Sequence, residues 1–313
     1  MDHVIATEKL TRTFGRLEAV HDLTLRVPTG SIFGLIGPNG AGKTTTLKVL
    51  MNLLRPTRGR AEVLGVDSRQ LGPTELAQIG YVSENQQLPS WMTVRELLAY
   101  CRPFYRTWDD AFAARLVDLL DLPLDRKIRH LSRGMTMKAK LVSSLAYRPR
   151  LLVLDEPFSG LDPLMRDEFV QGVLELAGEG GWSAVISSHD LEEIERLIDW
   201  VGYLRQGRLA FAESVVGLQA RFRQIEVVSP DAAIVAPTPL PPAWLNVTSA
   251  DRTLRFVHTQ YVAEETDQEL RARFPRAQVL AAPLSLRDTF IALARQDRGQ
   301  HGERASATAA VTA

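Results

Sequence analysis

Eight consecutive residues combine glycines, one lysine and one hydroxyl at a spacing that suits phosphate groups. The segment fits the pattern G-x-x-x-x-G-K-[ST] and consists of Gly37, Pro38, Asn39, Gly40, Ala41, Gly42, Lys43 and Thr44, with Thr45 directly after it. Glycines let several backbone N–H groups point inward, Lys43 adds a mobile cation, and the Thr44 hydroxyl suits Mg²⁺. The segment therefore predicts a polyphosphate site of the Walker A type.

The surroundings of this loop match what a phosphate site needs. Residues 31–36 are an apolar run that predicts a buried strand, and residues 45–54 predict a helix. The positive N-terminus of that helix would face the bound anion. This strand–loop–helix order disfavours the alternative of a glycine-rich turn with a solvated lysine.

Two acids end a second apolar run, at residues 151–157. Asp155 and Glu156 directly follow four apolar residues, and two carboxylates at the end of a buried strand are costly without a charged partner. Asp155 can hold Mg²⁺ through its water shell, and Glu156 can polarise a water that attacks a γ-phosphate. The pair has the form of a Walker B element.

Three weaker signals surround these motifs. Ser132 and Gly134 precede a helical pattern at residues 136–147 and form either a second anion site or an ordinary helix cap. Asp162 stands in capping position before Pro163. His189 ends an apolar run, where it either contacts a γ-phosphate or water or only closes a strand.

Two further residues have open interpretations. Phe14 lies in the connection between the first two expected strands and is either a purine-stacking aromatic or a loop hydrophobe. Glu84 begins a polar loop that either carries an oxygen toward a metal or water or is solvated surface. Together with Thr44 and Asp155, Glu84 is a candidate metal ligand.

Composition limits the class of protein. The chain has 313 residues, 45% apolar and 24% charged, with a formal net charge of zero. The length and composition are ordinary for a globular protein with one large and one small domain. A net charge of zero gives the protein no overall positive potential that would attract nucleic acid. No apolar run is long enough to span a membrane, and the N-terminus does not resemble a signal peptide. The single cysteine, Cys101, rules out an internal disulfide and is expected to be a packed thiol.

The expected organisation is a large α/β domain followed by a small one. Strands at residues 4–11 and 18–27 predict an antiparallel lobe, residues 60–66 and 79–83 further strands, and residues of about 90–148 a helical insert. After a proline-rich stretch, strands at 254–258 and 278–282 flank a helix at 263–274. We therefore expect domains at 1–222 and 223–297, with a disordered tail at 298–313.

In this order and spacing, the motifs resemble the ATP-binding cassette (ABC) ATPase family. The resemblance rests on the loop at 37–44, LSRGM at 131–135, LLVLDEP at 151–157, SGLD at 159–162 and His189, and it covers about the first 220 residues. It implies a phosphate-loop ABC nucleotide-binding domain with an antiparallel lobe, a parallel core sheet and a helical insert, plus a small α/β C-terminal domain.

The resemblance also implies residue roles. Phe14 would stack on adenine, Glu84 would be the Q-loop residue, Ser132 and Gly134 the signature residues, Asp162 the D-loop acid and His189 the switch histidine. Glu156, Lys43 and His189 would be catalytic, with ATP and Mg²⁺ bound. Arg133 and Met135 depart from the usual LSGGQ signature. Glu84 departs from the usual glutamine, and Gln86 and Gln87 offer an alternative alignment.

The implied function is ATP hydrolysis by the energy-coupling subunit of an ABC transporter. Family members form head-to-tail dimers, homomeric or heteromeric, in which ATP lies between one Walker A and the opposite signature. The ending PLSLRDTFIAL resembles the C-terminal extension of exporter ATPases. A soluble ABC ATPase acting on nucleic acid or ribosomes and a non-hydrolysing regulatory module are the alternatives.

The expected partner is a membrane-spanning permease on a separate chain, with no nucleic acid. The protein would then be cytoplasmic and peripheral on the inner face of the cell membrane through that permease. Docking is expected around residues 84–95, where Trp91 and Met92 are either apolar anchors or residues that pack under the insert.

Overall fold

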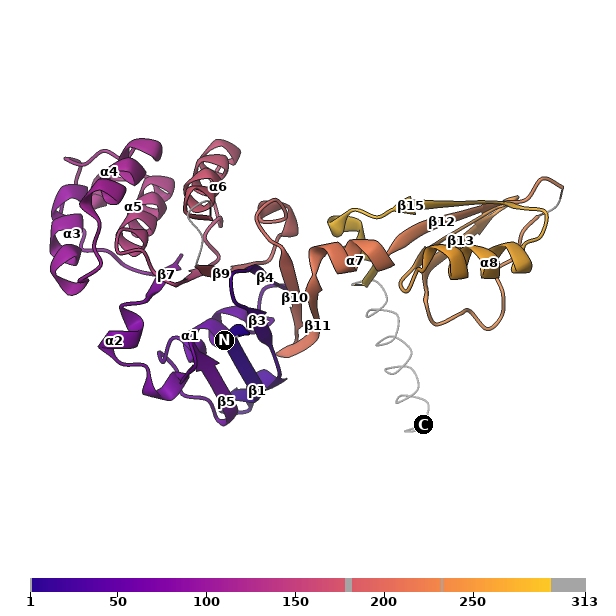
Figure 1. Ribbon diagram of the computed structural model, residues 1–313, viewed down its shortest axis with the longest axis horizontal. Coiled ribbons are helices and arrows are strands. Elements are labelled where there is room, and N and C mark those ends of the chain that lie inside the picture. The colour runs from indigo at the N-terminus through magenta and orange to yellow at the C-terminus, as the bar shows by residue number, and fades with distance from the viewer. Residues whose placement is uncertain (1, 178–181, 232, 294–313) are drawn as a thin grey trace. The chain divides into compact units, whose positions relative to one another are not determined.

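The computed structural model describes residues 2–177, 182–231 and 233–293 (Figure 1). The chain divides into two compact units, Met1–Glu213 and Ser214–Ala313. This division precedes the boundary expected after residue 222. The expected tail at 298–313 lies outside the described residues.

A six-stranded sheet forms the centre of the first unit, in the order β11-β10-β4-β9-β8-β7. Five of its strands run parallel to their neighbours: β4 (Ile32–Ile36), β7 (Ile79–Ser83), β8 (Leu151–Asp155), β9 (Ser183–Ser188) and β10 (Trp200–Arg205). The edge strand β11 spans Arg208–Ser214. The two apolar runs that end in polar residues, β8 and β9, are buried along their whole length, as expected for interior parallel strands. The parallel core is thereby confirmed.

An antiparallel sheet forms the second layer, in the order β2-β1-β5-β6 with β3 also paired to β1. Its strands are β1 (His3–Phe14), β2 (Leu17–Leu23), β3 (Arg26–Pro28), β5 (Arg58–Val63) and β6 (Val66–Asp67). The single strand expected at residues 18–27 is therefore two strands. Asp22, with φ of 45°, and its hydrogen bond to Thr11 mark where the backbone leaves the regular ladder.

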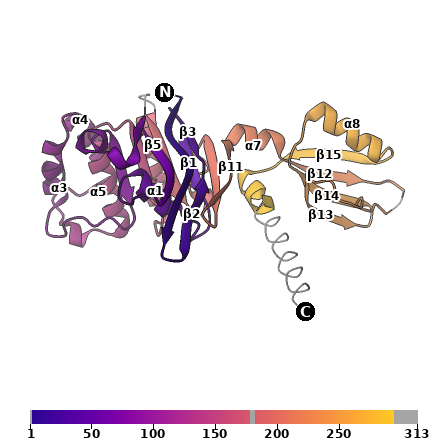
Figure 2. The same cartoon turned by 90° about the horizontal axis from the view of Figure 1, so that it is seen from below.

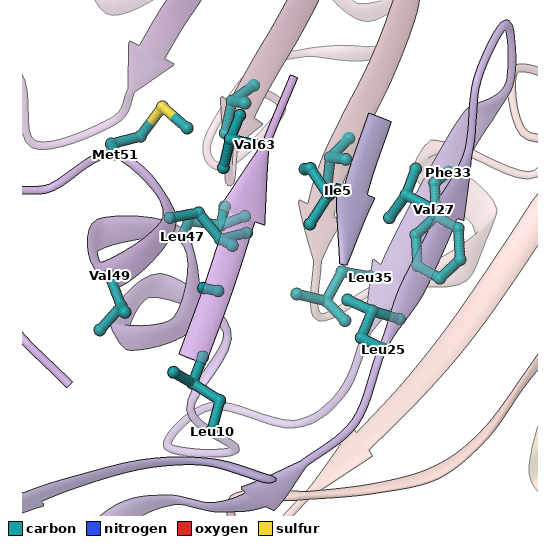
Figure 3. Close-up of a cluster of buried hydrophobic side chains, with 14 of the residues drawn as sticks. Ile5, Leu10, Leu25, Val27, Phe33, Leu35, Leu47, Val49, Met51 and Val63 are labelled. Carbon is teal, nitrogen blue, oxygen red and sulfur yellow. The ribbon is translucent and has the colours of Figure 1, made fainter. Parts of the chain in front are cut away.

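Helix α1 (Lys43–Leu50) packs between the two sheets. Figure 3 shows Leu47 of this helix pointing toward Val63 of the antiparallel sheet, and Val49, Ile5 and Leu35 belong to the same core cluster. All of these side chains are buried, so the helix that begins at the phosphate loop is fixed by apolar contacts on both sides.

Helices α3 (Val94–Cys101), α4 (Asp110–Leu119) and α5 (Arg133–Leu145) form the expected insert and gather on one side of this unit (Figures 1 and 2). Thr93 and Glu96 form a capping box at the start of α3. The remaining helical elements of this unit are α2 (Pro73–Leu76), α6 (Pro163–Ala177) and the short 3₁₀ turns η1 (Ser68–Gln70), η2 (Arg102–Phe104), η3 (Ile128–His130) and η4 (Leu191–Glu193).

The second unit begins with α7 (Val215–Arg221) and contains an antiparallel sheet in the order β13-β14-β12-β15. The strands are β12 (Arg223–Val228), β13 (Trp244–Ala250), β14 (Thr253–His258) and β15 (Gln278–Pro283), and α8 (Ala263–Arg273) lies on one face (Figure 2). Strand β13 was not expected from the sequence. Asn246, with φ of 52°, and a register shift between Leu245 and Thr248 interrupt the alternation that reveals a strand.

A final helical segment of the second unit starts after Ser285. The Ser285 hydroxyl accepts a hydrogen bond from Asp288 N at 3.0 Å and thereby caps this segment. Leu286, Phe290 and Ala292 on this segment are buried.

Candidate functional site

The phosphate loop follows the carboxyl end of β4 and has a backbone that requires glycine at several positions. Gly40 and Gly42 have φ of 80° and 101°, in the left-handed region. A Cβ on Gly37 would lie 2.1 Å from the Leu204 carbonyl oxygen. The loop therefore keeps a tight path, and α1 begins directly at Lys43 with its N-terminal N–H groups at the loop.

The Lys43 side chain folds back over its own loop and is buried. Its ammonium donates to the carbonyl oxygens of Gly37 at 2.6 Å and Pro38 at 3.2 Å. It also lies 3.0 Å from Oε1 of Glu156. A single cation thus connects the phosphate loop with the second acid of the Walker B element.

The Asp155 carboxylate is surrounded by hydroxyl groups from three other segments. Oδ1 accepts from Thr44 and from Ser187, each at 2.9 Å, and Oδ2 accepts from Ser83 at 3.4 Å. Strands β7, β8 and β9 are parallel neighbours, so their carboxyl ends meet at one edge. Thr44 and Asp155 were predicted from the sequence, whereas Ser83 and Ser187 were not. The available signal for these two serines was their position directly at strand ends.

The donor set at this edge fits a hard divalent cation. Thr44 and Asp155 offer a hydroxyl and a carboxylate that already lie at hydrogen-bond distance, and Mg²⁺ prefers oxygen ligands from one or two carboxylates together with water and phosphate. These two residues are therefore the ones that would hold Mg²⁺.

Glu156 is held on both sides of its carboxylate. Its backbone φ is 51°, unusual for a residue other than glycine, and its N–H donates to the Ser187 hydroxyl at 3.0 Å. Oε2 lies 2.8 Å from Nδ1 of His189. Burial raises the pKa of Glu156, but hydrogen bonds from His189 and Lys43 outweigh burial and lower this pKa below its ordinary value. Glu156 is accordingly ionised at neutral pH.

Behind His189 lies an ion pair that the sequence analysis missed. The Glu193 carboxylate accepts from the Ser188 hydroxyl at 2.6 Å and from Arg166 of α6 at 3.2 Å. Ligand atoms of Glu156, His189 and Glu193 lie within 4.8 Å of one another, but each has a protein partner already. We interpret the group as a hydrogen-bonded network that orients the end of β9.

The signature-like segment forms the start of α5. Ser132 caps the helix by accepting from Met135 N at 3.1 Å. Gly134 is buried, and a Cβ there would lie 2.0 Å from the Met165 sulfur. The cap and the tight approach thus account structurally for both residues, while an anion-binding role remains a prediction.

Glu84 belongs to two different contacts. Its backbone N–H donates to the Asp155 carbonyl at 3.2 Å, whereas its carboxylate pairs with Arg133. A metal-ligating role for this carboxylate would require that ion pair to break. The neighbouring Gln86 has a buried Oε1 without a hydrogen-bond partner in the described structure, so the alternative Q-loop alignment also remains a prediction.

Phe14, expected in the connection between two strands, is the last residue of β1, and Asp162 directly precedes α6. The Phe14 ring is 42% exposed, with the Arg12 guanidinium 4.4 Å from its centroid, and its stacking role remains a prediction. Asp162 caps α6 by accepting from Met165 N at 2.9 Å.

Comparison with known proteins points to one family. The family model described as ABC transporter matches residues 20–159. The bacitracin transport ATP-binding protein BcrA of Enterococcus faecalis is 31% identical over 226 residues, which cover 72% of this chain and 73% of that protein. BcrA of Bacillus licheniformis is 34% identical over 211 residues, covering 67% and 69%. A solved ATP-binding subunit of an ABC transporter has 28% identity and a TM-score of 0.62, covering 69% of this chain and 92% of that one.

The fold and the site define a phosphate-loop ATPase of the cassette type, and the chain belongs to the ATP-binding proteins of ABC transporters. It binds ATP and is the energy-coupling subunit that hydrolyses ATP to drive transport. No helix within the described ranges is long and apolar enough to cross a lipid bilayer.

Proposed function

We propose that this ATPase powers an exporter and works as a head-to-tail dimer with membrane-spanning subunits on separate chains. The exporter assignment is supported by similarity to two bacitracin transport ATP-binding proteins and by the C-terminal extension. The observation that carries the ATPase chemistry is the Glu156 carboxylate between Lys43 and His189.

In this proposal the residues divide the work as follows. Lys43 neutralises charge on the β/γ-phosphates, and ionised Glu156 accepts a hydrogen bond from the attacking water. His189, held by Glu156, contacts the γ-phosphate. Thr44 and Asp155 would hold Mg²⁺, which supplies neutralisation of developing phosphate charge.

The shared dimer site is supported by the placement of the signature-like segment. In the described part of the chain, the hydrogen bonds that assemble Lys43, Asp155 and Glu156 include none from Ser132 or Gly134. In this proposal the capped N-terminus of α5 serves the nucleotide of the opposite subunit.

Two substitutions at the cap test this dimer without removing the cap itself. Asp and Asn both cap helices well, but only Asp adds an anion. In a Glu156→Gln background, ATP should produce dimers in analytical sedimentation. Adding Ser132→Asn should preserve them, and adding Ser132→Asp should abolish them through repulsion of the γ-phosphate. Equal dimerisation of both variants would contradict the shared site.

Ser132 is the better position for this test than Gly134. Any side chain at Gly134 meets the Met165 sulfur within the same subunit. Loss of the dimer in a Gly134 variant would therefore not distinguish charge repulsion from local distortion.

We further propose that the permease docks beside the polar loop that follows β7. A pocket of about 490 Å³ there is lined by Glu84, Gln86, Gln87, Leu88, Ser90, Ile128, Leu131, Arg133, Thr136, Met137 and Lys140. Trp91 next to this loop is 64% exposed, whereas Met92 is 7% exposed. Of the two suggested anchors, Met92 packs under the insert, and Trp91 alone offers a large apolar surface.

Membrane pelleting tests the docking and the localisation together. When it is coexpressed with the permease, the protein should sediment with the membranes and not stay in the cytoplasmic fraction. Trp91→Glu should reduce the amount that sediments while ATP binding persists. Phe104→Glu is a matched control, because Phe104 is 65% exposed on the same insert but belongs to the 3₁₀ turn after α3 and not to the polar loop after β7. Full recovery of the wild type in the soluble fraction despite coexpression would favour a soluble ABC ATPase.

A further inference from the structure

The first residue of α5, Arg133, bridges three segments that are distant in sequence. Its guanidinium pairs with the Glu84 carboxylate after β7 and donates to the Ser159 hydroxyl, at 3.4 Å, after the Walker B motif. Arg133 itself stands between Ser132 and Gly134, so one side chain connects the signature-like segment with two loops beside the ATPase centre.

Both of those loops are hydrogen-bonded to the Walker B acids. Glu84 N donates to the Asp155 carbonyl at 3.2 Å, and Ser159 N donates to the Glu156 carbonyl at 3.3 Å. A displacement of Arg133 would therefore reach the backbone of Asp155 through Glu84 and the backbone of Glu156 through Ser159.

The structure leaves room for this particular side chain. Gly160 has φ of 69°, and a Cβ there would lie 2.4 Å from Nη1 of Arg133. A larger residue at 160 would thus displace the guanidinium from between its two partners.

A second cation of α5 holds the same loop. The buried Lys140, seven positions after Arg133 and therefore on the same face of the helix, donates to the carbonyl oxygens of Ser83 and Glu84, each at 3.0 Å. Helix α5 thus contacts the Glu84 loop at both the backbone and the carboxylate.

We propose that Arg133 is a positioning residue that couples the signature-like segment to the Asp155 and Glu156 carboxylates of its own subunit. The inference rests on the proposed dimer, in which Ser132 and Gly134 meet the nucleotide of the opposite subunit. When Ser132 and Gly134 bind that nucleotide, Arg133 changes the positions of Asp155 and Glu156 in its own subunit. The two ATP sites are thereby coupled and bind and hydrolyse ATP cooperatively.

A double-mutant cycle in the full-length dimer tests this coupling. Arg133→Gln and Glu84→Gln should each lower kcat about threefold, in line with the modest strength of an exposed ion pair, and move the Hill coefficient for ATP toward one. KM should change less than kcat. The double variant should be no slower than the single ones, because both remove the same interaction. Arg133→Lys, which keeps the charge, should restore part of the activity.

A matched control separates coupling from a general loss of surface charge. Arg102 and Asp110 form another exposed ion pair on the helical insert, 2.5 Å apart. Arg102→Gln should leave both kcat and the Hill coefficient unchanged.

The outcomes distinguish this inference from the proposed dimer. Failure of the Glu156→Gln protein to dimerise with ATP would reject the dimer, whatever Arg133 does. If that protein dimerises but Arg133→Gln retains the wild-type kcat and Hill coefficient, the coupling role is wrong. Additive losses in the double variant would also overturn it.

Discussion

The ammonium of Lys43 lies 3.0 Å from Oε1 of Glu156, on the opposite side of the carboxylate from His189. Nδ1 of His189 lies 2.8 Å from Oε2, so each oxygen of Glu156 has its own partner. The three residues form one connected unit, yet only Lys43 also holds the phosphate loop through the carbonyl oxygens of Gly37 and Pro38. Substitutions at Lys43 and Glu156 should therefore have different consequences.

Lys43→Ala should abolish ATP binding, because it removes both the phosphate cation and the hydrogen bonds that shape the loop. Glu156→Gln should retain ATP and reduce turnover by roughly 10²–10⁴-fold, the scale of a lost general base. Nucleotide titration and phosphate release measure the two properties. Lys48→Ala, on the same helix, is the control and should bind ATP normally. Wild-type turnover in Glu156→Gln would show that another residue is the base.

The lowered pKa of Glu156 predicts a pH dependence of stability. The pKa of Glu156 is lower in the folded protein than its ordinary value of about 4.3, so the ionised side chain stabilises the fold at pH values above about 4.3. This stabilisation is lost as the pH falls through the folded-state pKa. Thermal unfolding should therefore show the wild type more stable than Glu156→Gln at pH 7, with the difference shrinking at pH 4 and below. A difference that grows as the pH falls would contradict the ionised assignment.

The same pKa predicts that titration of Glu156 does not limit activity near neutrality. The carboxylate should stay ionised between about pH 6 and 8, because its pKa lies below an ordinary value of about 4.3. If ATPase activity falls between pH 8 and 6, another group causes the fall. The residual turnover of Glu156→Gln should then show a pH profile of the same shape as the wild type. A profile that becomes flat in this variant would assign the titration to Glu156.

The parts of the site that could be predicted are those defined by short sequence spacing. The phosphate loop and the acids 155–156 are contiguous segments, and the parallel-sheet rule brings their strand ends to one edge. Ser187, Arg166 and Glu193 were missed because their partners are reached only through tertiary folding. No spacing rule connects a helix residue such as Arg166 with a 3₁₀ turn 27 residues later.

The fold was predictable where hydrophobic periodicity is regular. Strands β8 and β9 and helix α5 appear in the sequence as clear apolar patterns. The alternation at 18–27 predicts one strand where the structure has two, because the positive φ of Asp22 leaves no mark in the sequence pattern. Strand β13 was not predicted, because Asn246 adopts a positive φ within it. Such a position breaks the period of two that identifies a strand.

Cys101 should react slowly with thiol reagents. Burial raises the pKa of this thiol, which lowers the thiolate fraction at pH 8, and the side chain is only partly accessible at the end of α3. We expect labelling at least about tenfold slower in the native protein than in urea, measured with a chromogenic disulfide. Cys101→Ala should keep its ATPase activity, and a strong loss of turnover would point to a role beyond packing.

The ion pair between Arg166 and Glu193 should affect turnover more than it affects ATP binding. Glu193 also accepts from Ser188, the residue before His189, so the pair connects the first turn of α6 with the end of β9. Glu193→Gln preserves shape but removes the charge, and the half-buried Arg166 guanidinium then loses its ionic partner. We expect kcat to fall about tenfold, KM to change less than about twofold, and stability to fall by about 1–3 kcal/mol.

A second ion pair that involves α6 separates positioning from simple destabilisation. Glu168 of α6 pairs with the buried Lys138 of α5 at 2.5 Å, and Lys138 also donates to the Leu120 carbonyl at 2.9 Å. Glu168→Gln should lower the unfolding temperature to a similar extent while kcat stays near that of the wild type. The two variants are compared at an equal loss of stability. A fall of kcat in both would therefore mean that Glu193 affects turnover only by stabilising the fold. A fall of kcat in Glu193→Gln alone would show that Arg166 and Glu193 orient His189 toward Glu156.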